Sequence, residues 1–448
     1  MRPPHCSLVC APASHHCSTS SHIDIVNCAY FVDVHFFHPL DDGAVNSHLT
    51  INAESITLSK NPRGYQREDA LQQEFEAAAE KLRDLDGWSN PAHDGQRELR
   101  ADLALEGGGV KGIAHVGAVL VLDEAGYRFH RVAGTSAGAI TASIIAAIVQ
   151  SGASMSTLRT SLRSINFRRF MPEGKLHELV HRDAGHMAKL VADAAILTSR
   201  EGLYSTEYLE EWLRPILHDQ LGIKTFADLR LPNADVDPHA VPAQQYRLVV
   251  YTSDLTRSRL TRLPWDYSSY GVDPDLQDPV TAVRASMSVP FYFAPVRFEA
   301  RETSVEVPES AGGSSMVHLP GGPHTWVDGA LLAKFPIHTF DGVESGTPQW
   351  PTIGIKLSQS HPDVPTGNVR ESALTIAVRC LRTMMNEWDA NAPHESTAMR
   401  TIFVNNNGIG TMDFDLSEQD QDGLFLNGVE AATRFVINAA RQGGVPRR

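Results

Sequence analysis

The stretch LALEGGGVKGIAHVGAVLVLDEAGYRFHRVAGTSAG, residues 103–138, decides the fold. It begins with a short apolar strand over 103–105, followed by a glycine-rich turn and a helix over 111–125. A second strand over 129–133 then leads through a tight turn into another helix. Strands and helices in alternation, joined by short connections, are typical of a parallel sheet with crossover helices. The sequence therefore predicts an α/β fold with a mainly parallel central sheet.

The tight turn at the end of this stretch has the pattern GxSxG, with Ser136 at its centre. Glycines on either side permit a sharp, strained turn between strand and helix, which presents the serine hydroxyl at the helix N-terminus. The helix dipole favours negative charge that develops there. We therefore predict a nucleophile elbow formed by Gly134, Thr135, Ala137 and Gly138 around Ser136.

The glycine-rich turn over 107–112 also contains GxGxxG, the pattern of a dinucleotide-binding turn. That function requires an acid at the end of the next strand, but the nearby acids Asp123 and Glu124 lie at the end of the helix. Consecutive glycines instead let backbone amides approach a reacting carbonyl, beside a helix N-terminus. Lys111 is either a solvated side chain or a group that attracts an anionic headgroup. We predict an oxyanion hole made of Gly107, Gly108, Gly109, Val110, Lys111 and Gly112.

A third turn, Asp328-Gly329-Ala330, follows the end of a predicted strand. A serine nucleophile needs a base, and no histidine stands in a comparable setting. His361 and His394 both lie beside prolines in polar segments. A carboxylate whose pKa is raised by an apolar pocket accepts the serine proton directly. Asp328 is therefore the predicted base.

Together these three motifs, in this order, closely resemble the patatin-like phospholipase family. The resemblance extends over about residues 103–357, and it includes ASMSVP at 285–290 and GLY at 202–204. It implies a three-layer α/β/α fold in which a serine–aspartate dyad works without histidine. By motif, Ser136 is the nucleophile and Asp328 the base. The resemblance implies neither a metal nor another cofactor.

The activity that the resemblance implies is hydrolysis of lipid acyl esters, as in a phospholipase A or a lysophospholipase. Gly108 and Gly109 would lead the oxyanion donors. Three alternatives remain open: an acyltransferase with the same acyl-enzyme, an α/β-hydrolase esterase that uses His361 or His394, and an inactive lipid-binding relative. The sequence leaves open which class of lipid or simpler ester is the substrate, and which protein partners the chain has.

The charge and the apolar stretches of the chain limit the classes of partner that it can have. The chain of 448 residues carries 39 Lys and Arg against 53 Asp and Glu, a net charge of −14, which argues against a nucleic-acid partner. Its longest apolar stretch, over 142–149, is far shorter than the roughly 20 residues needed to span a bilayer. We expect a cytoplasmic or peripherally membrane-associated protein. A basic, aromatic stretch over 158–170 is either a peripheral membrane contact or a solvated helix end.

The chain divides into four predicted parts. Residues 1–60 form a poorly structured, Cys- and His-rich leader, for which a zinc site is the alternative. Residues 61–100 hold an amphipathic helix and a linker. Residues 101–360 form the catalytic domain, and residues 361–448 form a helical extension packed on it, with one helix over 370–388.

Overall fold

A computed structural model describes most of the chain from residue 97 onward and short pieces before it. The described residues are 34–36, 47–49, 66–85, 89–91, 97–170, 206–232, 245–290, 292–308, 313–341, 350–357, 380, 383–384, 395–411 and 413–446. Most of the predicted leader lies outside this part. So do most of the helix predicted over 370–388, the segment 202–204, and both His361 and His394.

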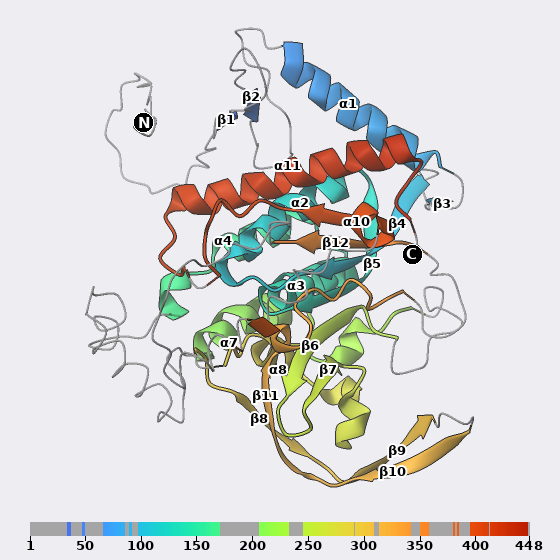
Figure 1. The fold of residues 1–448 in the computed structure, drawn as a ribbon, viewed down its shortest axis with the longest axis vertical. Coiled ribbons are helices and arrows are strands. Elements are labelled where there is room, and N and C mark those ends of the chain that lie inside the picture. The colour runs from blue at the N-terminus through green and yellow to red at the C-terminus, as the bar shows by residue number, and fades with distance from the viewer. Residues whose placement is uncertain are drawn as a thin grey trace, which may run out of the picture.

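The centre of the molecule is a sheet that contains nine strands of the described chain, in the order β13-β12-β4-β5-β6-β11-β8, with β3 beside β4 and β7 beside β6. Figure 1 shows this sheet in the middle of the ribbon. Its strands are β3 (Ser89–Pro91), β4 (Arg97–Leu105), β5 (Tyr127–Thr135), β6 (Leu248–Asp254), β7 (Arg259–Leu263), β8 (Val296–Ala300), β11 (Gly322–Asp328), β12 (Thr352–Lys356) and β13 (Thr401–Phe403).

Five neighbouring strands of this sheet, β13, β12, β4, β5 and β6, run parallel to one another. Beyond β6 the sheet turns antiparallel, because β11 and β8 run against their neighbours. The predicted α/β class with a mostly parallel central sheet flanked by helices is thus confirmed. Two further pairs stand apart from this sheet: β1 (Val34–Phe36) with β2 (Ser47–Leu49), and β9 (Thr303–Pro308) with β10 (Ser314–Leu319).

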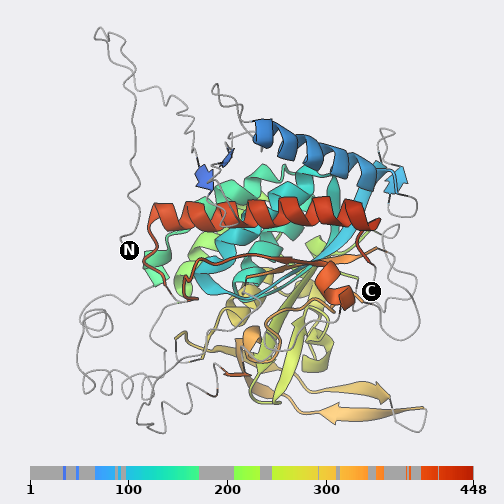
Figure 2. The ribbon, with the colours of Figure 1, turned by 45° about the horizontal axis from the view of Figure 1, so that its top comes forward.

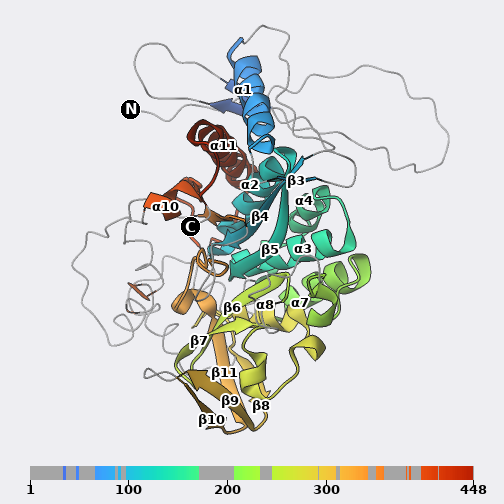
Figure 3. The same ribbon diagram turned by 90° about the vertical axis from the view of Figure 1, so that its right-hand side faces the viewer.

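Helices cover the sheet. The crossovers between β4, β5 and β6 are α2 (Ile113–Glu124) and α3 (Ala137–Ser151), which lie beside the strands in Figure 3. Helix α1 (Gln66–Arg83) packs on α11 (Glu418–Gln442), and both run across the top of Figures 1 and 2, far from the β9–β10 hairpin. The other helices and helical turns of the described chain are α4 (Ser156–Arg163), α7 (Glu207–Arg214), α8 (Pro279–Ser286), α10 (Glu395–Met399), η1 (Gly109–Gly112), η2 (Phe167–Phe170), η3 (Pro215–Gln220), η4 (Phe226–Leu229), η7 (Tyr267–Tyr270), η8 (Pro274–Leu276) and η9 (Gly329–Leu331).

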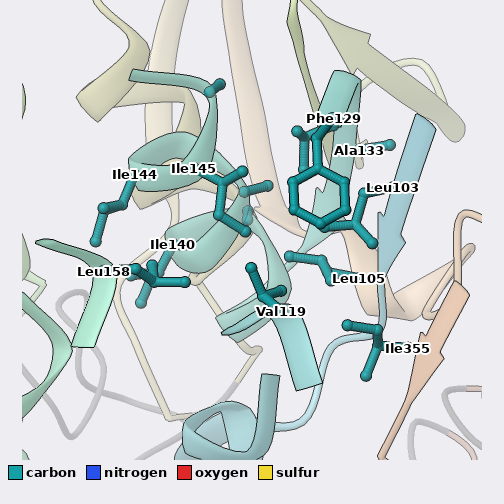
Figure 4. Packing of buried hydrophobic residues seen from close by; sticks show 14 of the residues in the cluster. Leu103, Leu105, Val119, Phe129, Ala133, Ile140, Ile144, Ile145, Leu158 and Ile355 are labelled. Carbon is teal, nitrogen blue, oxygen red and sulfur yellow. The ribbon is translucent and has the colours of Figure 1, made fainter. Parts of the chain in front are cut away.

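The hydrophobic core lies between the strands β4, β5 and β12 and the helices α2 and α3. Figure 4 shows Leu103 and Leu105 of β4 beside Val119 of α2 and the isoleucines of α3. Alternate residues of a strand point to the same face, so this spacing puts both leucines on the helix-covered side. Burying a side chain of this size contributes about 1.5–3 kcal/mol. Because α3 is apolar on nearly all sides and buried along most of its length, it fixes the turn that precedes it.

Three boundaries differ from the prediction. The strand predicted over 103–105 begins at Arg97, as β4. The helix predicted from residue 111 begins as the short turn η1, and α2 proper starts at Ile113. The strand predicted over 129–133 runs from Tyr127 to Thr135, because ladder bonds to both neighbours extend it. No helix in the described part of the chain combines the length and the apolar character that crossing a membrane requires.

Candidate active site

Ser136 stands at the corner between β5 and α3, where the backbone is strained. Its φ of 54° and ψ of −125° lie outside the regions that residues with a side chain ordinarily adopt. Such a conformation costs about 1–3 kcal/mol and persists only where the surroundings hold it. Its carbonyl accepts the amide of Ala139 at 2.8 Å in the first turn of α3. Thr135 ends the strand before Ser136, and Ala137 opens the helix after it.

Ser136 and Asp328 lie on either side of β6 at the same level. Thr135 pairs with Tyr251 of β6, and Asp328 pairs with Thr252 on the other side of that strand. Neighbouring strands are about 4.8 Å apart, so two strand spacings separate the two residues across the sheet. The structure therefore brings together two residues that are 192 positions apart in the sequence.

The glycine-rich turn reaches the same point. A Cβ placed on Gly107 would lie 3.2 Å from the Cβ of Ser136 and 3.6 Å from the Cβ of Ala330, which follows Gly329 in η9. A Cβ at this position would thus crowd the elbow and make ordinary van der Waals contact with the residue after the Asp-Gly pair. One methyl group placed on Gly107 would therefore lie within contact distance of residues from both other motifs.

Two hydrogen bonds tie these turns to the segment that follows Asp328. The amide of Gly107 donates to the carbonyl of Lys334 at 2.9 Å. The hydroxyl of Thr135 donates to the carbonyl of Ala333 at 2.9 Å. Residues 333–334 therefore hold the glycine-rich turn and the elbow in register with the end of β11.

The carboxyl group of Asp328 is fully buried, with 0% of the residue exposed. Its Oδ1 accepts the amide of Ala330 at 2.7 Å, and its Oδ2 has no hydrogen-bond partner in the described part of the chain. Burial raises the pKa of Asp328 to about 7, and the Ala330 amide and the Ser136 hydroxyl oppose this rise. A carboxyl with a pKa near neutrality and a free oxygen is suited to take up and return a proton.

In this structure the Ser136 hydroxyl does not bond to Asp328. Its Oγ lies 3.8 Å from the Sδ of Met287 and donates to that sulfur, and only 5% of Ser136 is exposed. Sulfur is a weak acceptor, so little energy holds the hydroxyl in this direction. The hydroxyl is near enough to Asp328 to affect its pKa, and it must leave Met287 to bond to Oδ2.

The glycine-rich turn leaves two amides free. The amides of Gly108 and Gly109 donate to no acceptor among the described residues, whereas those of Val110 and Lys111 bond to Thr411 and to Gly108. Gly109 has a φ of 57°, and a Cβ there would lie 1.9 Å from the carbonyl oxygen of Thr411. A side chain at this position is therefore excluded twice, by conformation and by space.

Not every predicted member of the oxyanion hole lies as expected. Lys111 is only 7% exposed, so the expectation of a solvated side chain is wrong. Gly112 packs against Ala137, since a Cβ added to Gly112 would lie 3.0 Å from the Cβ of Ala137. This close packing brings the start of α2 next to the elbow. Sequence reasoning also assigned no role to Glu106, whose carboxylate accepts the amide of Leu357 and holds the base of the turn. Its position directly before the three glycines is the sequence feature that could have indicated this role.

The arginines of the predicted basic stretch all have partners within the chain. Arg163 pairs with Asp422, Arg168 with Asp415 and Arg169 with Glu211. Arg159 lies over the ring of Phe425, while Phe170 is buried against Phe293 and Phe414. The stretch is therefore not an unpaired cationic surface. Among the described residues, no three His, Cys, Asp or Glu side chains are grouped so that they could hold a metal ion.

Comparisons with known proteins bear on the family to which the chain belongs. Residues 103–341 match the family model of the patatin-like phospholipases. One relative, the uncharacterized protein YqhO of Bacillus subtilis (strain 168), is 30% identical over 335 residues, which cover 75% of this chain and 97% of that protein.

Two solved structures resemble the chain more distantly. VipD from Legionella pneumophila aligns with a TM-score of 0.36 at 14% identity, covering 78% of this chain and 69% of VipD. The type III effector ExoU of Pseudomonas aeruginosa aligns with a TM-score of 0.35 at 16% identity, covering 77% of this chain and 53% of ExoU, so the alignment spans about half of that protein. The family match covers more than half of this chain, and the match to YqhO covers nearly the whole length of YqhO. The chain therefore belongs to the patatin-like phospholipase family.

Proposed function

We propose that this protein is a lipid acyl hydrolase, a serine esterase of the phospholipase A or lysophospholipase type. One observation carries the proposal: Ser136, strained at a strand-to-helix corner, lies beside a buried Asp328 that has a free carboxylate oxygen. The family supports lipid hydrolysis as the class of reaction. The geometry supports a serine–aspartate dyad as its means.

The first half of the reaction would form an acyl-enzyme. The Ser136 hydroxyl turns from Met287 toward Asp328, whose Oδ2 removes the proton as Oγ attacks the ester carbonyl. The tetrahedral intermediate then collapses, the ester C–O bond breaks, and Asp328 gives its proton to the departing alcohol. The acyl group remains on Oγ.

The second half would return the enzyme to its starting state. Asp328 removes a proton from water, which attacks the acyl carbon, and the fatty acid leaves as Oγ regains the proton. Near neutral pH, a carboxyl with a pKa of about 7 populates both its protonated and its deprotonated form, so it can act as base and then as acid.

The oxyanion hole is proposed at the amides of Gly108 and Gly109. Both are free in the described chain, and they precede the N-terminus of α2. Each such donor typically contributes about 3–4 kcal/mol to transition-state stabilisation. The remaining residues of the turn shape this pocket: Gly107 leaves room beside Ser136, and Gly109 admits Thr411.

A screen of fatty-acid release tests the proposal. Wild-type protein, Ser136→Ala and Asp328→Asn are incubated with phospholipid, lysophospholipid, triacylglycerol and a simple soluble ester, and the released fatty acid is measured. Wild type should release fatty acid from at least one class, and both variants should release almost none. Activity in Ser136→Ala equal to that of wild type would reject the assignment.

The same acyl-enzyme supports transfer to another acceptor, so an acyltransferase remains the second candidate. Product analysis with and without an added alcohol or lysolipid separates the two, since a transferase makes a new ester. A histidine-dependent esterase would instead need His361 or His394. Full activity after replacing each of them with alanine would reject that alternative.

A further inference from the structure

The segment at the end of α8 contacts both Ser136 and Asp328. Ser286, the last residue of α8, bonds to the backbone of Ser136, and the next residue, Met287, accepts the Ser136 hydroxyl. The carbonyl of Ser288 accepts the amide of Asp328 at 2.9 Å. Three consecutive residues from a distant part of the sequence thus lie against both groups. This segment belongs to the motif ASMSVP, to which the proposed mechanism assigns no role.

Ser286 makes two hydrogen bonds through one hydroxyl. Its Oγ accepts the amide of Ser136 at 2.8 Å and donates to the carbonyl of Tyr251 at 2.6 Å. Tyr251 is the residue of β6 that pairs with Thr135, so the hydroxyl extends the link between β5 and β6 one residue past their last pair. Ser286 is 0% exposed, and water does not compete for these bonds.

These bonds act where the backbone is strained. The carbonyl of Ser136 is fixed by the first turn of α3, and among the described residues its amide bonds only to the Ser286 hydroxyl. Without the hydroxyl, the amide would be buried and unpaired, and the peptide between Thr135 and Ser136 would be free to rotate toward a relaxed φ. Such a rotation swings the Cβ of Ser136, and with it Oγ, away from Asp328 and from the glycine amides.

We propose that Ser286 is a positioning residue for the nucleophile: its hydroxyl holds the Ser136 amide and so keeps the strained elbow in the geometry needed for attack. This inference rests on the proposed function, since it assigns Ser286 to the same reaction. Ser286 does not contact the substrate. It acts through Ser136, so its loss should reduce turnover with little change in substrate affinity.

The chain offers a matched control in the same segment. Ser288 is also fully buried, and its hydroxyl bonds at 2.9 Å to the carbonyl of Arg284, within the turn that ends α8. Removing the Ser288 hydroxyl therefore deletes a partly buried hydrogen bond to a backbone carbonyl two residues away. It leaves the contact between its backbone carbonyl and Asp328 in place, and it does not touch the elbow.

The experiment compares full-length wild type, Ser286→Ala and Ser288→Ala with a soluble p-nitrophenyl ester and with a fluorophosphonate probe. For Ser286→Ala we expect kcat and the labelling rate to fall about 10- to 100-fold, which corresponds to the free energy of leaving the Ser136 amide buried and unpaired. KM should stay within about threefold of the wild-type value. The pH midpoint of the rate should stay where it is in wild type, because Asp328 is unchanged. Ser288→Ala should keep kcat within about threefold of wild type.

A second pair, Ser286→Thr and Ser286→Val, decides the question if Ser286→Ala does not fold. Threonine and valine have nearly the same shape and differ in the hydroxyl, so their steric costs cancel. We expect Ser286→Thr to turn over at least about 10-fold faster than Ser286→Val. Equal rates in this pair, or equal losses in Ser286→Ala and Ser288→Ala, would overturn the positioning role. Wild type that neither hydrolyses the ester nor takes the label at Ser136 would instead overturn the proposed function.

Discussion

Asp254 and Asp328 end two neighbouring strands, β6 and β11, and both are shielded from solvent. They lie two positions apart along one antiparallel ladder, since Asp254 pairs with Trp326 and Asp328 with Thr252. Their partners differ. Asp254 accepts hydrogen bonds from the hydroxyl of Tyr270 and from the amides of Thr256 and Arg257, and lies 2.8 Å from Nδ1 of His324.

Asp328 has one partner for two oxygens. Its Oδ1 accepts the Ala330 amide, whereas its Oδ2 bonds to nothing in the described chain. A buried polar group without a partner costs free energy that a saturated group does not. The comparison teaches that burial alone does not leave a carboxylate oxygen without partners. Asp254 is saturated and joins strands together, whereas Asp328 retains one oxygen without a partner in the described chain.

Removing each carboxylate in turn gives the largest expected contrast. Asp328→Asn should lower kcat by at least about a thousandfold, because the proposed base is lost, and it should fold normally. Steady-state hydrolysis of a soluble ester measures this effect.

Asp254→Asn is the matched change on the neighbouring strand. It places an amide group among donors, so the free energy of unfolding should fall by about 2–4 kcal/mol, while the folded protein keeps kcat within about threefold. Chemical denaturation and ester hydrolysis separate the two effects. Equal losses of activity in Asp254→Asn and Asp328→Asn would contradict the difference drawn here between the two carboxylates.

The pH dependence of the rate is the next largest effect. With a pKa of about 7, Asp328 is mostly protonated at pH 5, so kcat/KM should be about 100-fold lower there than at pH 8. A pH–rate profile of wild type on a soluble ester measures the midpoint. A profile that is flat from pH 5 to 8 would contradict a base with a raised pKa.

The same group affects stability with the opposite trend. Between its usual value of 3.8 and about 7, folded Asp328 keeps a proton that the unfolded chain has released. The unfolded state then binds fewer protons, so this contribution to stability falls as the pH rises through that window. Asp328→Asn should lack this fall, and denaturation curves of the two proteins at pH 5 and pH 7.5 check it.

His115 in α2 sharpens the comparison, because it is another buried group without partners but no part of the proposed reaction. Neither ring nitrogen has a hydrogen-bond partner in the described chain, and burial lowers its pKa from 6.5 to about 3. The unfolded state binds the proton first, so stability should fall by up to about 1.4 kcal/mol for each pH unit below 6.5. His115→Leu should reduce this slope, whereas the same change at the exposed His318 should not.

The smallest effect is expected at the basic stretch. Arg168 and Arg169 are already paired with Asp415 and Glu211 on the surface, where such pairs contribute at most about 1 kcal/mol. Replacing both with alanine should weaken binding to anionic vesicles by no more than about fivefold. Turnover of a soluble ester should not change. A larger loss in a vesicle sedimentation assay would favour the membrane contact over the solvated helix end, the two alternatives that the sequence left open.

Much of this arrangement could be predicted from the sequence, because the deciding residues occupy short turns. The alternation of strands and helices indicated the α/β fold, and the three motifs indicated the family, both of which are confirmed. Gly107 and Ser136 follow the parallel strands β4 and β5, whose carboxyl ends share one edge of the sheet. Ala330 follows β11, which runs antiparallel to β6, so its contact with the other two could not be predicted from that rule.

What the sequence could not supply are contacts whose partners lie far apart. Ser286 bonds to Ser136 across 150 positions, and nothing local marks that serine as different from Ser288. The same limit applies to the arginines. Arg163 and Arg168 pair with Asp422 and Asp415 of the C-terminal segment, and the charges along one stretch could not decide between a membrane contact and a solvated helix end.

Labelling with a fluorophosphonate probe tests the central claim most directly, since it reports the nucleophile without assuming a substrate. Intact-mass and peptide analysis of wild type should show one adduct, on Ser136, formed much more slowly in Asp328→Asn and absent from Ser136→Ala. An adduct on another residue, or labelling of Asp328→Asn as fast as that of wild type, would contradict the claim that this aspartate activates this serine.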